Sequence, residues 1–163
     1  FRELIARLEI PATFAFSAEE GTATLPLETR PAASPVADCE WARRLGDLLF
    51  GLDGALSDRA RGAYGRALAV PAGCLAPSDE SRLGAWLGAV AVNENRPGDA
   101  LALLDRALGA GNRELSTLIN RATALEALGR APAAAAAWRA VAAQAADPAL
   151  ASRARARAAR LGD

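Results

Sequence analysis

A pattern of small and large apolar residues returns three times along this chain at nearly the same interval. Each copy places alanines at helical spacing around one large side chain, and the copies comprise Ala60, Tyr64, Ala67 and Leu68; Ala100, Leu104, Ala107 and Leu108; and Ala134, Trp138 and Val141. The first alanines of successive copies are 40 and then 34 residues apart. A period of this length indicates one structural unit repeated along the chain, in which each unit buries its apolar face only by stacking on its neighbours.

The overall composition excludes several classes of function. With 163 residues the chain has about the length of one domain, and its 19 basic residues balance 19 acidic ones. A neutral chain is a poor match for the phosphate backbone, so no nucleic-acid partner is expected. The longest uncharged apolar run, from Leu83 to Val92, is about half a membrane span. We therefore expect a soluble protein without membrane insertion. All basic residues are Arg and Ala is abundant, which indicates the codon bias of a GC-rich bacterium, with the cytoplasm slightly favoured over the periplasm.

The first 36 residues differ from the rest of the chain. Residues 1–10 have a helical pattern without an initiator Met, which predicts the end of a longer upstream region. Residues 13–17 and 22–28 are short runs of strand-forming residues, and the four residues between them end in Gly21. This spacing predicts a β-hairpin. Residues 30–35 then have the composition of a linker.

From Asp38 onward the cap and turn signals predict helices of about 12 to 15 residues. The predicted spans run from Trp41 to Leu52, from Ser57 to just before Pro71, from Ser78 onward, from Pro97 to Gly109 or Gly111, from Asn112 to Gly129, from Pro132 to Asp147, and from Pro148 to Gly162. Ser57, Ser78 and Asn112 are predicted N-caps, and Pro97 suits a first helical turn. Short loops make consecutive helices fold back on each other, which gives three antiparallel hairpins and a final single helix.

These residues resemble the tetratricopeptide repeat (TPR), a helix–turn–helix unit of about 34 residues. Leu45-Gly46 and Leu87-Gly88 match the Leu-Gly pair of its first helix, and Ala100, Leu104 and Ala107 match the small and large residues of its second. The resemblance covers residues 37–163, in units of about 39–71, 81–114 and 115–148 with a capping helix at 148–162. It implies an all-α, right-handed array. The alternative is an ordinary helical bundle, because an alanine-rich chain produces alanine matches by chance.

The resemblance also implies a function, which is to bind a peptide or a partner domain in the concave groove formed by the first helix of each hairpin. The units of about 81–114 and 115–148 match the family pattern better than the first unit does. In this register their groove residues are Arg82, Ala85, Ala89, Asn93, Ser116, Ile119, Asn120, Thr123 and Glu126. Family members that clamp a terminal carboxylate use several Lys, Arg and Asn residues here. This chain offers only Arg82, Asn93 and Asn120, which argues against that mode.

Catalytic, metal and cofactor chemistry is not expected. The chain contains no His, and it has no nucleophile elbow, phosphate-binding loop or paired-cysteine motif. Cys39 and Cys74 flank the first hairpin at the same end and could form a disulfide, which would imply a periplasmic or secreted setting. The alternative is two small buried hydrophobic residues in a reduced protein.

Two other functions stay open at this point. The segment could be the non-catalytic docking or assembly tail of a larger enzyme, which the start at Phe1 and the isolated β-hairpin favour. It could also be a self-association module that forms a homo-oligomer through an uncapped apolar patch at the Trp41 end. The final helix, with Arg153, Arg157 and Arg160 on one face, has a further interpretation as a basic membrane-surface helix, although its apolar face is mostly alanine.

The repeat register predicts unequal effects of the same substitution at two neighbouring sites. Ala100→Leu should destabilise the protein by roughly 1 to 3 kcal/mol, because Ala100 lies at a helix crossing where a larger side chain overpacks the interface. Ala102→Leu should be nearly neutral. Thermal unfolding of both variants measures the difference, and similar melting temperatures would show that the register is wrong.

Overall fold

In the computed structural model, the described residues are 35–54, 57–70 and 74–162, and within these ranges the protein is all-α. Seven helices are described there, with no strand. Their bounds are α2 Pro35–Asp53, α3 Asp58–Ala69, α4 Pro77–Asn93, α5 Pro97–Gly109, α6 Leu115–Ala127, α7 Ala131–Gln144 and α8 Pro148–Gly162. The predicted β-hairpin lies outside the described residues.

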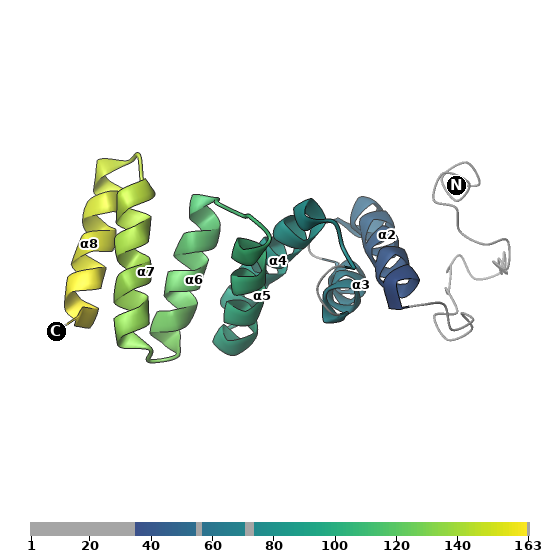
Figure 1. Ribbon diagram of the computed structural model, residues 1–163, viewed down its shortest axis with the longest axis horizontal. Coiled ribbons are helices and arrows are strands. Elements are labelled where there is room, and N and C mark those ends of the chain that lie inside the picture. Colours follow the sequence, from purple (N-terminus) through teal and green to yellow (C-terminus); the bar gives the residue numbers. More distant parts are fainter. Residues whose placement is uncertain (1–34, 55–56, 71–73, 163) are drawn as a thin grey trace, which may run out of the picture.

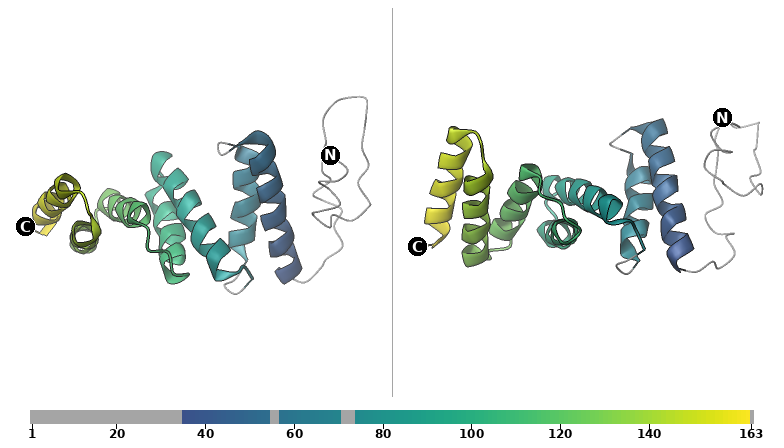
Figure 2. Two further views of the ribbon diagram at one scale, coloured as in Figure 1. Left: turned by 90° about the horizontal axis from the view of Figure 1, so that it is seen from above. Right: turned by 45° about the horizontal axis from the view of Figure 1, so that its top comes forward.

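The helices form an elongated row of pairs (Figure 1). Helix α2 packs on α3, α4 on α5, and α6 on α7, while α8 folds back on α7. Adjacent pairs meet through α3 against α4 and through α5 against α6, and α4 also contacts α6. The views in Figure 2 show α2 and α8 at opposite ends of the row. None of the described helices has both the length and the apolar character needed to cross a membrane.

Three helices end in the same hydrogen-bonded cap. Asn95, Gly111 and Gly129 follow α4, α5 and α6 with positive φ angles of 55°, 95° and 67°. In each case the amide of the next residue donates to a carbonyl five residues earlier, at 2.8 Å (Arg96 to Ala91), 2.9 Å (Asn112 to Ala107) and 3.0 Å (Arg130 to Leu125). This Schellman geometry favours glycine, with asparagine as the usual substitute. The repeated cap gives the α4–α5 and α6–α7 turns the same length and direction.

The predicted helix starts are partly right. Ser57 is the N-cap of α3, and its hydroxyl accepts from the amide of Ala60 at 3.2 Å. Two starts are too late, because α2 begins at Pro35 rather than Trp41 and α4 begins at Pro77 rather than Ser78. Both helices begin on a proline, whose fixed φ and missing N–H suit the first helical position. Pro35 therefore belongs to α2 and not to a linker.

Asn112 does not cap α6 as predicted, since that helix begins at Leu115 with Glu114 at the N-cap position. The Asn112 side chain is buried, with its Oδ1 accepting from the Glu114 amide at 3.0 Å. Its Nδ2 donates to the carbonyl of Ser81 at 3.5 Å. The amide therefore connects the α5–α6 loop to α4, a use that a search for helix caps does not detect.

The cores of the first two hairpins depend on a glycine of the first helix facing a large residue of the second. A Cβ atom built on Gly46 would lie 2.4 Å from Cδ1 of Tyr64, and one built on Gly88 would lie 2.6 Å from Cγ of Leu104. Tyr64 and Leu104 are both almost fully buried. Ala122 and Trp138, each 34 residues after Gly88 and Leu104, are buried in the same core cluster as Leu104. These contacts leave no room for larger side chains on the first helix.

The first hairpin is joined to the second by a hydrophobic core cluster that includes Leu83 and Leu87 of α4, by polar contacts and by a disulfide. Arg106 of α5 donates to the carbonyls of Leu68 and Val70 at the end of α3, and it also pairs with Glu80. The disulfide joins Cys39 of α2 to Cys74 in the segment before α4, with their Cα atoms 6.2 Å apart. This separation lies within the range that a disulfide can span. The bond therefore links α2 to the connection between the two hairpins.

Reduction of the Cys39–Cys74 disulfide should lower stability by roughly 3 to 4 kcal/mol, because the bond restricts the unfolded chain across a separation of 35 residues. Protein purified without reductant should show no titratable thiol until it is unfolded in reductant, and the Cys39→Ser/Cys74→Ser variant should melt at the temperature of the reduced protein. Two reactive thiols in the air-exposed, unfolded protein would contradict the pairing.

Candidate partner-binding groove

The nine predicted groove residues lie on α4 and α6, which pack against each other. We call the surface that carries them the groove face. Every one of the nine side chains is exposed or half-buried, and none belongs to the fully buried core. Helix α4 contributes Arg82, Ala85, Ala89 and Asn93, while α6 contributes Ser116, Ile119, Asn120, Thr123 and Glu126. Because Ala85 and Ala89 have small side chains, the groove face projects little from α4 at these two positions.

The neutral polar residues of the groove face differ in how far the fold already uses them. The Thr123 hydroxyl donates to the carbonyl of Ile119 at 2.9 Å, and the Ile119 side chain packs against the core. Within the described part of the chain, the amide groups of Asn93 and Asn120 make no hydrogen bond. These two amides are therefore the groups on the groove face that are best able to bind a ligand, since each offers both donors and an acceptor.

Glu126 is already bound by three side chains from the last two helices. Its carboxylate accepts from Nε1 of Trp138 at 3.0 Å and pairs with Arg157 at 3.1 Å and Arg160 at 3.6 Å. The Arg157 guanidinium also lies 4.5 Å from the centre of the Trp138 ring. Glu126 therefore connects α6 to α7 and α8, and its charge is not left for a partner at the groove.

Arg82 belongs to a group of four charged residues that sequence reasoning missed. It pairs with Asp79 at 3.2 Å and with Asp47 of α2 at 3.5 Å. Arg43 pairs with the same two carboxylates, at 2.6 Å to Asp47 and 3.4 Å to Asp79. We call Arg43, Asp47, Asp79 and Arg82 the α2–α4 charge cluster. The pairs within one helix follow from spacings of three and four residues, but the pairs between helices require the tertiary structure.

Tyr64 connects the hydrophobic core to this charge cluster. Its hydroxyl donates to Oδ1 of Asp47 at 2.7 Å, and its ring packs edge-on against Trp86 with the ring centres 5.6 Å apart. Burial, followed by the hydrogen bond to the negatively charged Asp47, raises the pKa of the Tyr64 hydroxyl to about 12. The neutral phenol is therefore the form that the folded structure favours.

The groove face as a whole suits an uncharged ligand. Its two charged members, Arg82 and Glu126, are already paired within the fold. Across residues 35–54, 57–70 and 74–162 there is no group of three or more His, Cys, Asp and Glu side chains placed to hold a metal ion. The remaining side chains are small, aliphatic or amide-bearing, which suits main-chain amides and carbonyls better than phosphate or carboxylate groups.

Comparison with known proteins yields no assignment, since no protein-family model, curated protein or solved structure matches the chain. The interpretation of the groove face therefore depends on the residues and contacts of this protein.

Tyr64 is the only tyrosine among the 163 residues, so its ionisation can be followed directly by absorbance. The native protein should titrate with a pKa of about 12, and the protein in denaturant should titrate near 10.0. Because the folded-state pKa is the higher one, the contribution of Tyr64 to stability should be constant below pH 10 and should fall as the pH rises towards 12. A native tyrosine that titrates near 10 would contradict the buried phenol.

Proposed function

We propose that this protein is a TPR-like interaction module that binds an extended peptide, or an extended segment of a partner protein, on the groove face. The observation that supports this most strongly is the recurrence of one contact in corresponding hairpins, with Gly46 against Tyr64 and Gly88 against Leu104. Stacked hairpins of this kind present the first helix of each unit along one surface, and such surfaces are used for binding.

The chemistry of the groove face favours a peptide backbone as the ligand. An extended peptide carries an N–H donor and a carbonyl acceptor at almost every residue, and it pairs with groups that offer both. Asn93 and Asn120 provide such groups from two adjacent helices. Ala85 and Ala89 leave space for the peptide to lie close to α4. A terminal carboxylate is a less suitable ligand, because Arg82 is already paired with Asp47 and Asp79.

Exposed apolar side chains at the end of α2 favour self-association as a second candidate function. Leu52 is 57% exposed, and Phe50 is 40% exposed although its ring packs against Trp86. These residues lie in the first hairpin, at one end of the row (Figure 1). Light scattering at increasing protein concentration distinguishes the two functions, since an oligomer that Leu52→Glu dissociates would favour self-association.

The groove proposal predicts that replacing Asn93 and Asn120 together with alanine weakens peptide binding without affecting the fold. A suitable ligand is a synthetic peptide selected against the wild-type protein from a random displayed library. Loss of two hydrogen bonds should weaken its binding by about 1 to 3 kcal/mol. In the middle of that range the Kd rises more than tenfold. The melting temperature should barely change, since neither side-chain amide makes a hydrogen bond within the described fold.

The matched control is Arg66→Ala/Arg139→Ala, which removes two exposed side chains from the second helices of their hairpins. This variant should bind the selected peptide with wild-type affinity. Unchanged binding by the double-asparagine variant would remove the groove face as the site. An equal loss of stability and affinity would show instead that the two asparagines are structural.

A further inference from the structure

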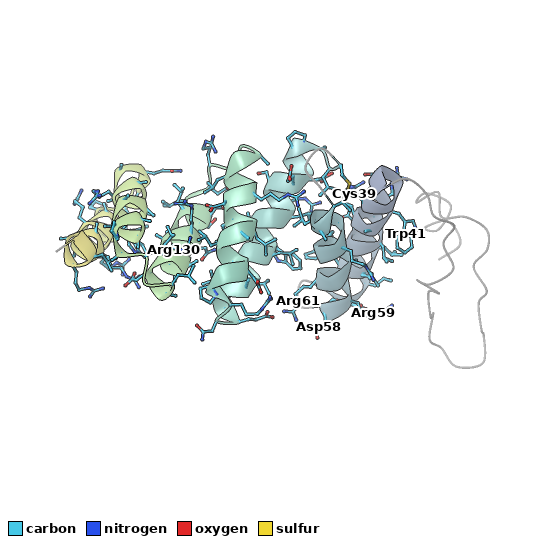
Figure 3. The ribbon with its side chains drawn as sticks, turned by 60° about the horizontal axis from the view of Figure 1, so that its bottom comes forward. Cys39, Trp41, Asp58, Arg59, Arg61 and Arg130 are labelled. Carbon is cyan, nitrogen blue, oxygen red and sulfur yellow. A yellow bond between two sulfur atoms is a disulfide. The ribbon has the colours of Figure 1, made fainter. Side chains whose placement is uncertain are left out.

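Helix α8 concentrates positive charge at one end of the row. It contains four arginines and no acidic residue, whereas basic and acidic residues balance over the whole chain. The helix lies at the end opposite Cys39 and Trp41 (Figure 3). Its apolar side is already used, because α8 packs on α7 and Ala151, Ala154 and Ala158 are buried. The arginines are therefore the part of α8 that is left for a partner.

Three of these arginines lie on one side of α8. Arg153, Arg157 and Arg160 are spaced by four and three residues, so they form a single row along the helix. We call this row the α8 arginine face. Arg155, two residues after Arg153, lies on the opposite side of the helix.

The α8 arginine face meets the groove face at Glu126. This groove-face residue pairs with Arg157 at 3.1 Å and with Arg160 at 3.6 Å. The interval of 34 residues that relates the cores of the second and third hairpins agrees with this contact. By that interval, the α8 arginine face follows three groove-face residues of α6, which are Ile119, Thr123 and Glu126. The groove face of α4 and α6 therefore continues onto α8.

Most of the charge on the α8 arginine face is not neutralised within the described part of the chain. Arg153 is exposed and makes no hydrogen bond or ion pair there. Arg157 and Arg160 share the carboxylate of Glu126, and Arg160 remains 70% exposed. The Arg157 guanidinium is held 4.5 Å from the centre of the Trp138 ring. Three positive charges thus face one negative charge, and the surface favours an anionic group.

The distribution of charge identifies the kind of anionic ligand. The surface is uncharged or internally paired over α4 and α6, and it is positive only where it reaches α8. A polypeptide with acidic side chains at one end has the complementary pattern. A nucleic acid carries phosphate along its whole length, so much of its charge would lie over the part of the surface that offers no free cation. Guanidinium groups also match carboxylates in geometry, since they can donate two parallel hydrogen bonds.

We propose that the segment bound on the groove face carries acidic side chains where it reaches α8, and that Arg153 and Arg160 bind them. Arg157, which is held by Trp138 and Glu126, adds its charge to the same site. This inference rests on the proposed function, and it specifies the class of peptide that the groove face binds.

The test is a selection of short random peptides that are displayed with their C-termini fused to a coat protein, so that carboxylates come from side chains alone. The full chain is used as wild type, as Arg153→Gln/Arg160→Gln and as Arg139→Gln/Arg155→Gln. The last variant is the matched control, because it removes two exposed and unpaired arginines of α7 and α8 that lie outside the α8 arginine face. Peptides selected by the wild type and by the control should be enriched in Asp and Glu at one end. Those selected by Arg153→Gln/Arg160→Gln should not.

Affinities measured with the most enriched wild-type peptide, synthesised with an acetylated and an amidated end, give the second readout. Its Kd should be roughly threefold to tenfold higher for Arg153→Gln/Arg160→Gln, as expected for the loss of two exposed ion pairs. Replacing its acidic residues with the corresponding amides should raise the Kd for the wild type by a similar factor. The control should bind the peptide as the wild type does, and the melting temperatures should agree because the substituted side chains are exposed.

The outcomes separate this inference from the groove proposal. Selected peptides that depend on Asn93 and Asn120 but lack acidic enrichment would overturn the inference and leave the groove proposal intact. Acidic peptides that bind equally well to Asn93→Ala/Asn120→Ala would support recognition by α8 and contradict the groove proposal. An equal loss of affinity in the control would show that net charge alone matters, which would overturn the inference.

Discussion

The close approach of paired helices is the constraint on which the whole structure depends. A glycine of the first helix admits a large side chain of the second, as Gly46 admits Tyr64 and Gly88 admits Leu104. The helices then lie too close together to bury more than this one strip of side chains between them. Their outer apolar surfaces remain uncovered within a single hairpin, so they must pack on the next hairpin. The elongated row in Figure 1 is the consequence of that requirement.

Hydrophobic packing joins each hairpin to the next, and the first two hairpins are also linked by directional contacts. Hydrophobic packing joins α4 and α5 to α6, and their side chains share one core cluster. The first hairpin shares another hydrophobic core cluster with Leu83 and Leu87 of α4. It is also linked to the second hairpin by the α2–α4 charge cluster, by the hydrogen bonds from Arg106 to the end of α3, and by the Cys39–Cys74 disulfide. The ion pairs with Asp47 and Asp79 hold Arg82 next to the groove face.

Sequence reasoning could predict the features that local chemistry determines. The Ser57 cap and the Gly129 turn follow from residue types and spacing, and the structure has both. The α2–α4 charge cluster, the bridge from Asn112 to Ser81 and the binding of Glu126 by Trp138, Arg157 and Arg160 could not be predicted in this way. Each joins residues from different helices or loops, and periodicity specifies which side of a helix a residue occupies but not its partner.

The most direct test of the close-approach constraint is a double-mutant cycle on Gly88 and Leu104. In the wild type, Gly88→Ala should destabilise the protein, because the new methyl group would lie 2.6 Å from Cγ of Leu104. In a Leu104→Ala background the methyl group has room, so the same change should be neutral or stabilising. We expect a coupling free energy of at least about 1 kcal/mol from denaturant unfolding of the four proteins. Additive effects within about 0.5 kcal/mol would contradict the account, because they would mean that the two residues do not meet.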